Sequence, residues 1–213
     1  MAKSKPAVKS ARPPFEWAGH HFLNRTLALD FANTVVYRDR PDRRDDRLTD
    51  RRAVENWALA SGQPVRLRPD ATLGEAIRIR ESIDAFFRHT ALNDAPHADL
   101  WRRLVGLYVR HGVSIPQAAP ALSARRRRAA RRPPSDLFSA LLHAALETAF
   151  SPLMPRIKVC PSCGWLFIDR TRNGGKRWCV PSLCGNRARA RRFYAKRAGK
   201  RAGPRFDTSR RLK

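Results

Sequence analysis

All four cysteines of the 213-residue chain lie between residues 160 and 184, in the stretch CPSCGWLFIDRTRNGGKRWCVPSLCGNR. Their spacing is Cys-x2-Cys-x15-Cys-x4-Cys. Two disulfides, a redox pair and a site for one metal ion would each use these residues. Two close pairs joined by a segment that can fold back favour zinc, because Zn²⁺ takes four thiolates tetrahedrally at about 2.3 Å.

The alternatives fit less well. The N-terminal MAKSKPAVKSARPPFEW has basic residues but no apolar run behind them, so we expect no secretory signal and a soluble, cytoplasmic chain in which disulfides are rare. A redox Cys-x-x-Cys would open a helix after a strand and would need no second pair. Four thiolates leave no position for a catalytic water. We therefore expect one structural zinc ion per chain, bound by Cys160, Cys163, Cys179 and Cys184.

The segment between the cysteine pairs predicts a hairpin. Trp165–Ile168 is prone to form a strand, and Lys176–Cys179 can pair with it across the turn signal Asn173-Gly174-Gly175. A knuckle, a hairpin and a following helix are the plan of a treble-clef zinc finger. Zinc should supply folding free energy to so small a module.

The charge is the second strong constraint. Lys and Arg number 44 against 18 Asp and Glu, a formal net charge of +26, and the excess is densest after residue 160. Such an excess favours a nucleic-acid partner. GNRARARRFYAKRAGK, after Cys184, predicts a basic helix, with Ala190, Phe193 and Tyr194 expected to seat it on the finger. The candidate nucleic-acid contacts are Arg177, Arg187, Arg189, Arg191, Arg192, Lys196 and Arg197.

The remaining sequence predicts a mostly helical first domain over residues 15–155, preceded by a disordered basic tail, 1–14. Apolar periodicity predicts helices at 27–35, 51–62, 73–92, 99–112 and 136–150. The charged segment 37–50 and the Arg-rich segment 123–134 are expected to be exposed loops. The finger should cover 156–198 and a second basic, disordered tail 199–213. No apolar run is long enough to predict a membrane helix.

Three polar residues interrupt the apolar stretch 27–35, namely Asp30, Asn33 and Thr34. They either line a ligand pocket, as a sensor needs, or satisfy nearby backbone groups, which such side chains readily do. The sequence has no phosphate-binding glycine loop, nucleophile elbow or paired catalytic carboxylates, so we do not expect an enzyme.

Two sets of motifs resemble known families. Cys160-Pro161-Ser162-Cys163, Phe167, Asp169 and Arg177-Trp178-Cys179, followed by Cys184-Gly185-Asn186-Arg187, resemble the CGNR zinc finger. LALDFANTV at 27–35, with Leu48-Thr49-Asp50, Asn56-Trp57 and Ser61-Gly62, resembles the ABATE domain. The resemblance implies bacterial, stress-responsive transcription regulators with an α+β, sensor-like first domain and a treble-clef finger that binds DNA. It also implies that the four cysteines are zinc ligands.

We therefore expect a nucleoid-associated, DNA-binding regulator of α+β class. Its first domain would bind a small-molecule effector or form a homodimer. Two rival classes remain: an RNA- or ribosome-associated zinc protein, and an enzyme whose finger docks a nucleic-acid substrate. Competition between duplex DNA and structured RNA at fixed salt distinguishes the first rival from a DNA-binding regulator. The second rival needs a catalytic cluster that the sequence lacks.

Overall fold

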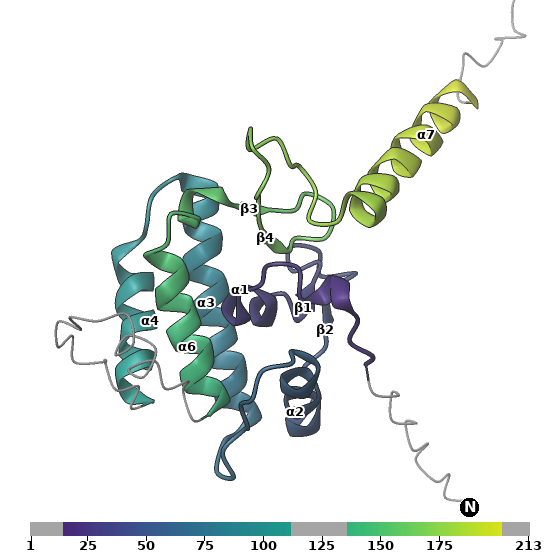
Figure 1. Cartoon of the computed structure of the whole chain (residues 1–213). Coiled ribbons are helices and arrows are strands. Elements are labelled where there is room, and N and C mark those ends of the chain that lie inside the picture. The colour runs from purple at the N-terminus through teal and green to yellow at the C-terminus, as the bar shows by residue number, and fades with distance from the viewer. Residues whose placement is uncertain (1–14, 112–135, 202–213) are drawn as a thin grey trace, which may run out of the picture.

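The computed structural model describes residues 15–111 and 136–201. The predicted tail 1–14, the Arg-rich segment 123–134 and residues 202–213 of the predicted tail 199–213 lie outside the described residues. Residues 199–201, predicted to be disordered, are helical. The described chain forms a layer of helices, a two-stranded hairpin and a cysteine-bearing segment that leads into a long helix (Figure 1). The predicted fold class, a mostly helical first part followed by a small zinc finger, is confirmed.

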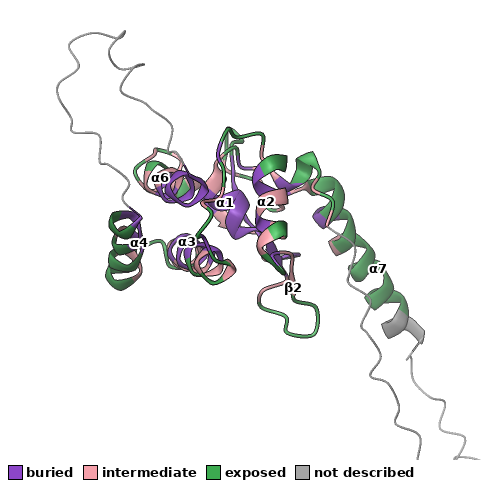
Figure 2. Cartoon of the chain, turned by 90° about the horizontal axis from the view of Figure 1, so that it is seen from below, coloured by how far each residue is buried: buried purple, intermediate pink, exposed green. Residues whose placement is uncertain are grey.

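The helical layer is built around α3 (Leu73–Asn93). A capping box starts this helix, because the Thr72 hydroxyl accepts from the Glu75 amide and the Glu75 carboxylate accepts from the Thr72 amide. Helix α3 packs against α1 (Leu27–Ala32), α4 (Ala98–Arg110) and α6 (Leu137–Ala149). The buried sides of these helices face one another and their exposed sides face outward (Figure 2).

Sequence periodicity located these helices and α2 (Arg51–Ala60) correctly, but α1 is shorter than predicted. It ends at Ala32 because Asn33 and Thr34 use their side chains to bond backbone groups instead of continuing the helix. Val35–Val36 then forms β1, which pairs with Asp45–Asp46, β2. Among the helices of the described ranges, none is both long enough and apolar enough to cross a membrane.

The charged segment 37–50 is only partly exposed, contrary to expectation. Residues 39–44 are exposed, but the ends of the segment are tied to α3 by ion pairs. Arg80, which is 1% exposed, holds both carboxylate oxygens of Asp46 at 2.6 and 2.7 Å. Arg38 pairs with Glu81 and Asp84. Alternating charges predicted solvation here because sequence does not reveal which of them have a partner on another helix.

The hairpin differs from the predicted one. Ile157–Val159, β3, pairs with Leu166–Ile168, β4, in the register Ile157↔Ile168 and Val159↔Leu166. The expected partner of β4, residues 176–179, is not a strand. The turn of the hairpin is the Cys160–Cys163 knuckle itself, where Gly164 has a φ of 78° and its amide donates to the Cys160 carbonyl.

Strand β4 belongs to two cores at once. Leu166 and Ile168 are buried in the core formed by the helices, whereas Phe167, between them, is buried in a second core around the cysteines. Successive side chains of a strand point to opposite faces, so a three-residue strand can serve both cores. The finger therefore shares its hairpin with the helical layer.

The outer edge of β4 is covered by two asparagine side chains instead of a third strand. Asn33 accepts from the Leu166 amide and donates to the Leu166 carbonyl, both at 2.8 Å. Asn24 accepts from the Ile168 amide at 3.1 Å and donates to the Leu166 carbonyl at 3.3 Å. Both asparagines are buried, so these bonds satisfy backbone groups that water cannot reach.

Replacing Asn33 by alanine should therefore destabilise the fold. The change leaves the buried amide and carbonyl of Leu166 without their close partner, and we expect the free energy of unfolding to fall by about 2–4 kcal/mol. Urea unfolding of the zinc-loaded chain, followed by circular dichroism, measures this. Asn173→Ala, at an exposed position, is the control and should change little. Equal unfolding midpoints for Asn33→Ala and the wild type would contradict this role of Asn33.

Candidate metal centre and nucleic-acid interface

The four cysteine sulfurs converge on one point. All four Sγ atoms lie within 4.8 Å of one another, and the cysteines are buried. Cys163 Sγ is 3.5 Å from Cys179 Sγ, which is 3.6 Å from Cys184 Sγ. A tetrahedral site with zinc–sulfur bonds of about 2.3 Å has sulfur–sulfur edges of about 3.8 Å, so the arrangement fits one zinc ion with a closed shell.

The thiols on their own compete for protons. Hydrogen bonding with Cys163 lowers the pKa of Cys160, and the same interaction raises the pKa of Cys163, because the four sulfurs are too close for all of them to ionise. A dication beside all four sulfurs removes this conflict by stabilising each thiolate. The donor set thus calls for a metal, and Cys160, Cys163, Cys179 and Cys184 form one structural zinc site per chain.

The knuckle is positioned by the helical layer. The Tyr37 amide donates to the Cys163 carbonyl at 2.8 Å, and Arg88 of α3 donates to the Gly164 carbonyl at 2.7 Å. Asp84 orients Arg88 by accepting from two of its nitrogens, at 2.8 and 2.9 Å. Val36 also packs into the core around the cysteines. Sequence reasoning missed Arg88, because a helical arginine gives no local sign of a partner 76 residues away.

The loop after β4 is organised by Asp169, the one acidic residue in the finger sequence 156–198. Its carboxylate accepts from Lys158 Nζ at 2.7 Å, from the Lys176 amide at 2.8 Å and from the amide and hydroxyl of Thr171. Lys158 also donates to the Gly174 carbonyl. Burial opposes ionisation, but these hydrogen bonds hold the pKa of Asp169 below its usual range. The sequence signal for Asp169 was its place in the CGNR motif.

Helix α7 (Asn186–Arg201) starts directly after the last cysteine, which lies in the π-helical turn η3 (Pro181–Gly185), and projects away from the body (Figure 1). Gly185 fixes its start, because a Cβ there would lie 3.3 Å from Trp178 Cδ1. The expectation that Ala190, Phe193 and Tyr194 seat the helix is wrong, since all three are exposed, Phe193 and Tyr194 to 55% and 68%. Helical periodicity predicted a narrow apolar stripe on this helix, but it could not predict how far the stripe lies from the finger.

The predicted nucleic-acid contacts fall into two groups. Arg187 donates to the Tyr37 hydroxyl at 3.1 Å and Arg191 to the Ser162 hydroxyl at 2.9 Å, so both arginines tie the first turns of α7 to the body. Arg177 lies beside Trp178 in the loop before α7, with its guanidinium 5.4 Å from a ring centroid. The others are exposed along α7: Arg189, Arg192, Lys196 and Arg197.

The three polar residues of the stretch 27–35, Asp30, Asn33 and Thr34, do not gather in one pocket. Asn33 bonds Leu166, and Thr34 donates to the Phe31 carbonyl at 2.8 Å, which is the backbone-satisfying alternative. Of the three, Asp30 alone borders a cavity of about 590 Å³ in the described part of the chain, lined by residues from α1, α6 and β4. Arg25 and Arg170 also line it.

Asp30 is unusual in its protonation. Burial raises its pKa from 3.8 to about 7, against the hydrogen bonds that it accepts from the Asn24 amide and side chain. These bonds also connect Asp30 to β4, since Asn24 bonds Leu166 and Ile168. Near neutral pH this carboxyl group therefore changes charge beside the cavity.

Two family models match the chain. The CGNR zinc finger model matches residues 156–197, and the ABATE model, described as "Putative stress-induced transcription regulator", matches residues 25–152. No curated protein matches the chain. Both matches are those that the sequence motifs indicated.

Zinc binding should depend on each sulfur and on pH. Cys163→Ser should lower zinc affinity strongly, and for the wild type the affinity should fall as the pH falls, because the ligands must be deprotonated. Elemental analysis and competition with a chelator at pH 6 and pH 8 measure both effects. Ser182→Ala, at an exposed position of η3, should keep one zinc ion per chain. Undiminished zinc affinity in Cys163→Ser would rule out the four-sulfur site.

Asp30→Asn should change the pH dependence of stability. The pKa of Asp30 in the folded chain, about 7, exceeds the ordinary value of 3.8, so its contribution to stability is full below pH 4 and is lost as the pH rises through 7. The amide cannot ionise, so the stability of the variant relative to the wild type should rise by about 3 kcal/mol between pH 5 and pH 8. Urea unfolding at these two pH values tests this.

The control for this experiment is Asp42→Asn, at an exposed position. It should differ from the wild type by the same small amount at both pH values. A constant difference for Asp30→Asn as well would show that Asp30 does not carry the pH dependence.

Proposed function

The chain belongs to the ABATE family and ends in a CGNR zinc finger, and from this premise we propose that it is a transcription regulator that binds DNA through α7. The role is one of binding, not of catalysis. Its place would be the bacterial cytoplasm, on the nucleoid.

One observation carries this proposal: the strongly basic helix α7 begins next to the zinc site and projects away from the body. Residues 186–197 of α7 are almost all exposed, and the helix carries Arg or Lys at eight positions between Asn186 and Arg201. So dense a row of like charges destabilises an isolated helix. Phosphates would remove this repulsion, and a helix of this width fits the major groove of B-DNA.

The contacts at the base of α7 support the same role. Zinc ligation, the Gly185–Trp178 contact and the bonds of Arg187 and Arg191 fix the direction in which the helix leaves the body. A rigid projection presents its outer cations to a duplex in one orientation, so less entropy is lost on binding.

RNA is the alternative partner, because any phosphate backbone attracts the same charges. Duplex DNA is favoured by the shape of the projection, since the major groove of A-form RNA is too deep and narrow for a helix. Competition between a DNA duplex and a structured RNA at one salt concentration distinguishes the two.

The first domain is proposed to sense a small effector, and the cavity of about 590 Å³ supports this. Its wall contains Asp30 of the helical layer and Arg170 of the finger. Arg170 donates to the Asn24 carbonyl at 3.0 Å, so a bound molecule would touch groups that join the two parts.

The double substitution Arg192→Ala/Lys196→Ala should weaken duplex binding about 10- to 100-fold near 0.1 M salt while zinc stays bound. Each lost phosphate contact should also reduce the slope of log K against log salt by about 0.9. Fluorescence anisotropy over a salt series gives both quantities.

The matched control removes the same charge elsewhere. Arg103→Ala/Arg110→Ala changes two exposed arginines of α4, away from α7. It should alter affinity and slope far less. If both double variants lose the same affinity, general charge and not α7 drives binding, and the proposal fails.

A further inference from the structure

Phe193 lies on the side of α7 that faces away from the body. At about 100° per residue, Phe193 falls within roughly 60° of Arg189, Lys196 and Arg197 around the helix axis. The guanidinium of Arg197 is 5.5 Å from the centroid of the Phe193 ring. The phenyl ring is 55% exposed. Phe193 is thus an apolar group set among the outward cations.

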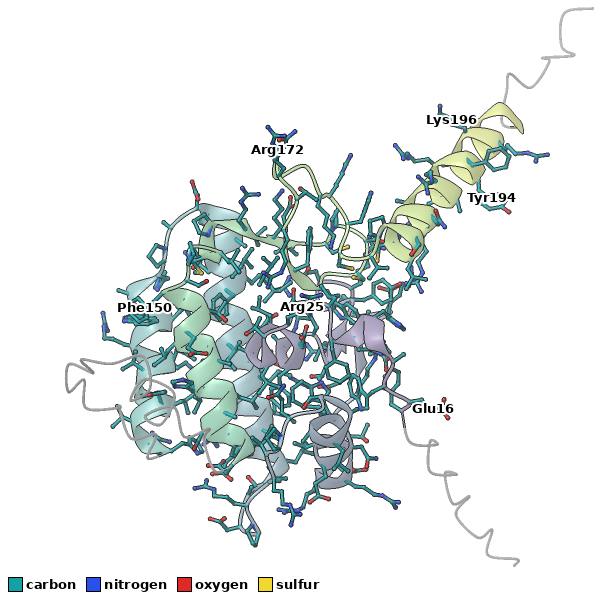
Figure 3. The ribbon with its side chains drawn as sticks, viewed as in Figure 1. Glu16, Arg25, Phe150, Arg172, Tyr194 and Lys196 are labelled. Carbon is teal, nitrogen blue, oxygen red and sulfur yellow. The ribbon has the colours of Figure 1, made fainter. Side chains whose placement is uncertain are left out.

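Tyr194, the neighbouring exposed aromatic residue, lies about 100° further round the helix axis, with its ring centroid 5.6 Å from that of Phe193. It follows Arg187 by seven residues and Arg191 by three, so it shares their side of the helix, the side that meets the body. Figure 3 shows Tyr194 and Lys196 pointing away from opposite sides of α7. The two aromatic rings touch, but Phe193 lies nearer the outward cations and Tyr194 nearer the arginines that meet the body, which allows a matched comparison.

Exposure of one large apolar side chain needs no explanation by itself. The position of Phe193 does need an explanation. A helix in the major groove contacts phosphates with the edges of its inner face, and it contacts base edges with the middle of that face. Arg189 and Arg197 lie at about 40° on either side of Phe193. Cations at those positions can reach the groove walls while the ring points at the floor.

A phenyl ring has no hydrogen-bond donor or acceptor, so it can read only apolar groups. The apolar group in the major groove is the C5 methyl of thymine. We propose that Phe193 is the base-edge contact of α7 and that it packs against thymine methyl groups of duplex DNA, an assignment that rests on the proposed function.

The test compares two duplexes of one thymine-rich sequence, one of them with every thymine replaced by deoxyuridine. The replacement removes the methyl groups and keeps charge and base pairing. The zinc-loaded wild type should bind the thymine duplex about four-fold more tightly for each methyl buried. Fluorescence anisotropy at fixed salt measures the ratio of the two affinities.

Phe193→Ala should bring this ratio to one, with an unchanged salt slope because no phosphate contact is lost. Phe193→Leu should keep part of the ratio, and Tyr194→Ala should keep all of it. Zinc content and helical circular dichroism of each variant check that α7 is intact.

Two results overturn the assignment and leave DNA binding standing: equal wild-type affinity for both duplexes, or a ratio that survives in Phe193→Ala. Absence of binding to either duplex instead overturns the proposed function itself.

Discussion

The cysteine knuckle between β3 and β4 is the constraint on which the rest of the structure depends. Its sulfurs point toward the metal, and its carbonyls at Cys163 and Gly164 accept hydrogen bonds from Tyr37 and Arg88 of the helical layer. The same few residues therefore fix the metal site and the orientation of the finger. Gly185 packs on Trp178, and α7 begins at the next residue. The direction of α7 therefore follows from the coordination of zinc.

Local signals in the sequence predicted what is local in the structure. The cysteine spacing predicted the metal site, and periodicity predicted α2, α3, α4 and α6. The partner of β4 was missed because Asn173-Gly174-Gly175 is a strong turn signal, whereas the true turn is the knuckle. The bonds from Asn33 to Leu166 join residues 133 apart, and a lone asparagine does not indicate a partner so distant.

The arginines of α7 are chemically alike, so their sequence could not separate their roles. The structure separates them by surroundings. Arg187 and Arg191 meet hydroxyl groups of the body, whereas Arg192 and Lys196 face solvent. The first pair ties the first turns of α7 to the body, and the second pair stays exposed on the part of the helix beyond them. Hydrophobic periodicity had a similar limit, because it grouped Phe193 with Tyr194, whose rings do touch, but it could not show that both stay exposed.

Sharing β4 between two cores gives a physical route from the helical layer to α7. Asn24 donates two hydrogen bonds to Asp30 Oδ1 and also holds the edge of β4, so a molecule in the cavity that displaced Asp30 would displace Asn24 as well. Ile168 and Phe167 sit on opposite faces of that strand, so a shift that loosens one core also moves the other. Cys163 lies only a few residues before β4 along the chain, so the movement would also reach Cys163. A change at α1 can therefore reach the finger and the base of α7 through hydrogen bonds and packing, without a hinge between separate domains.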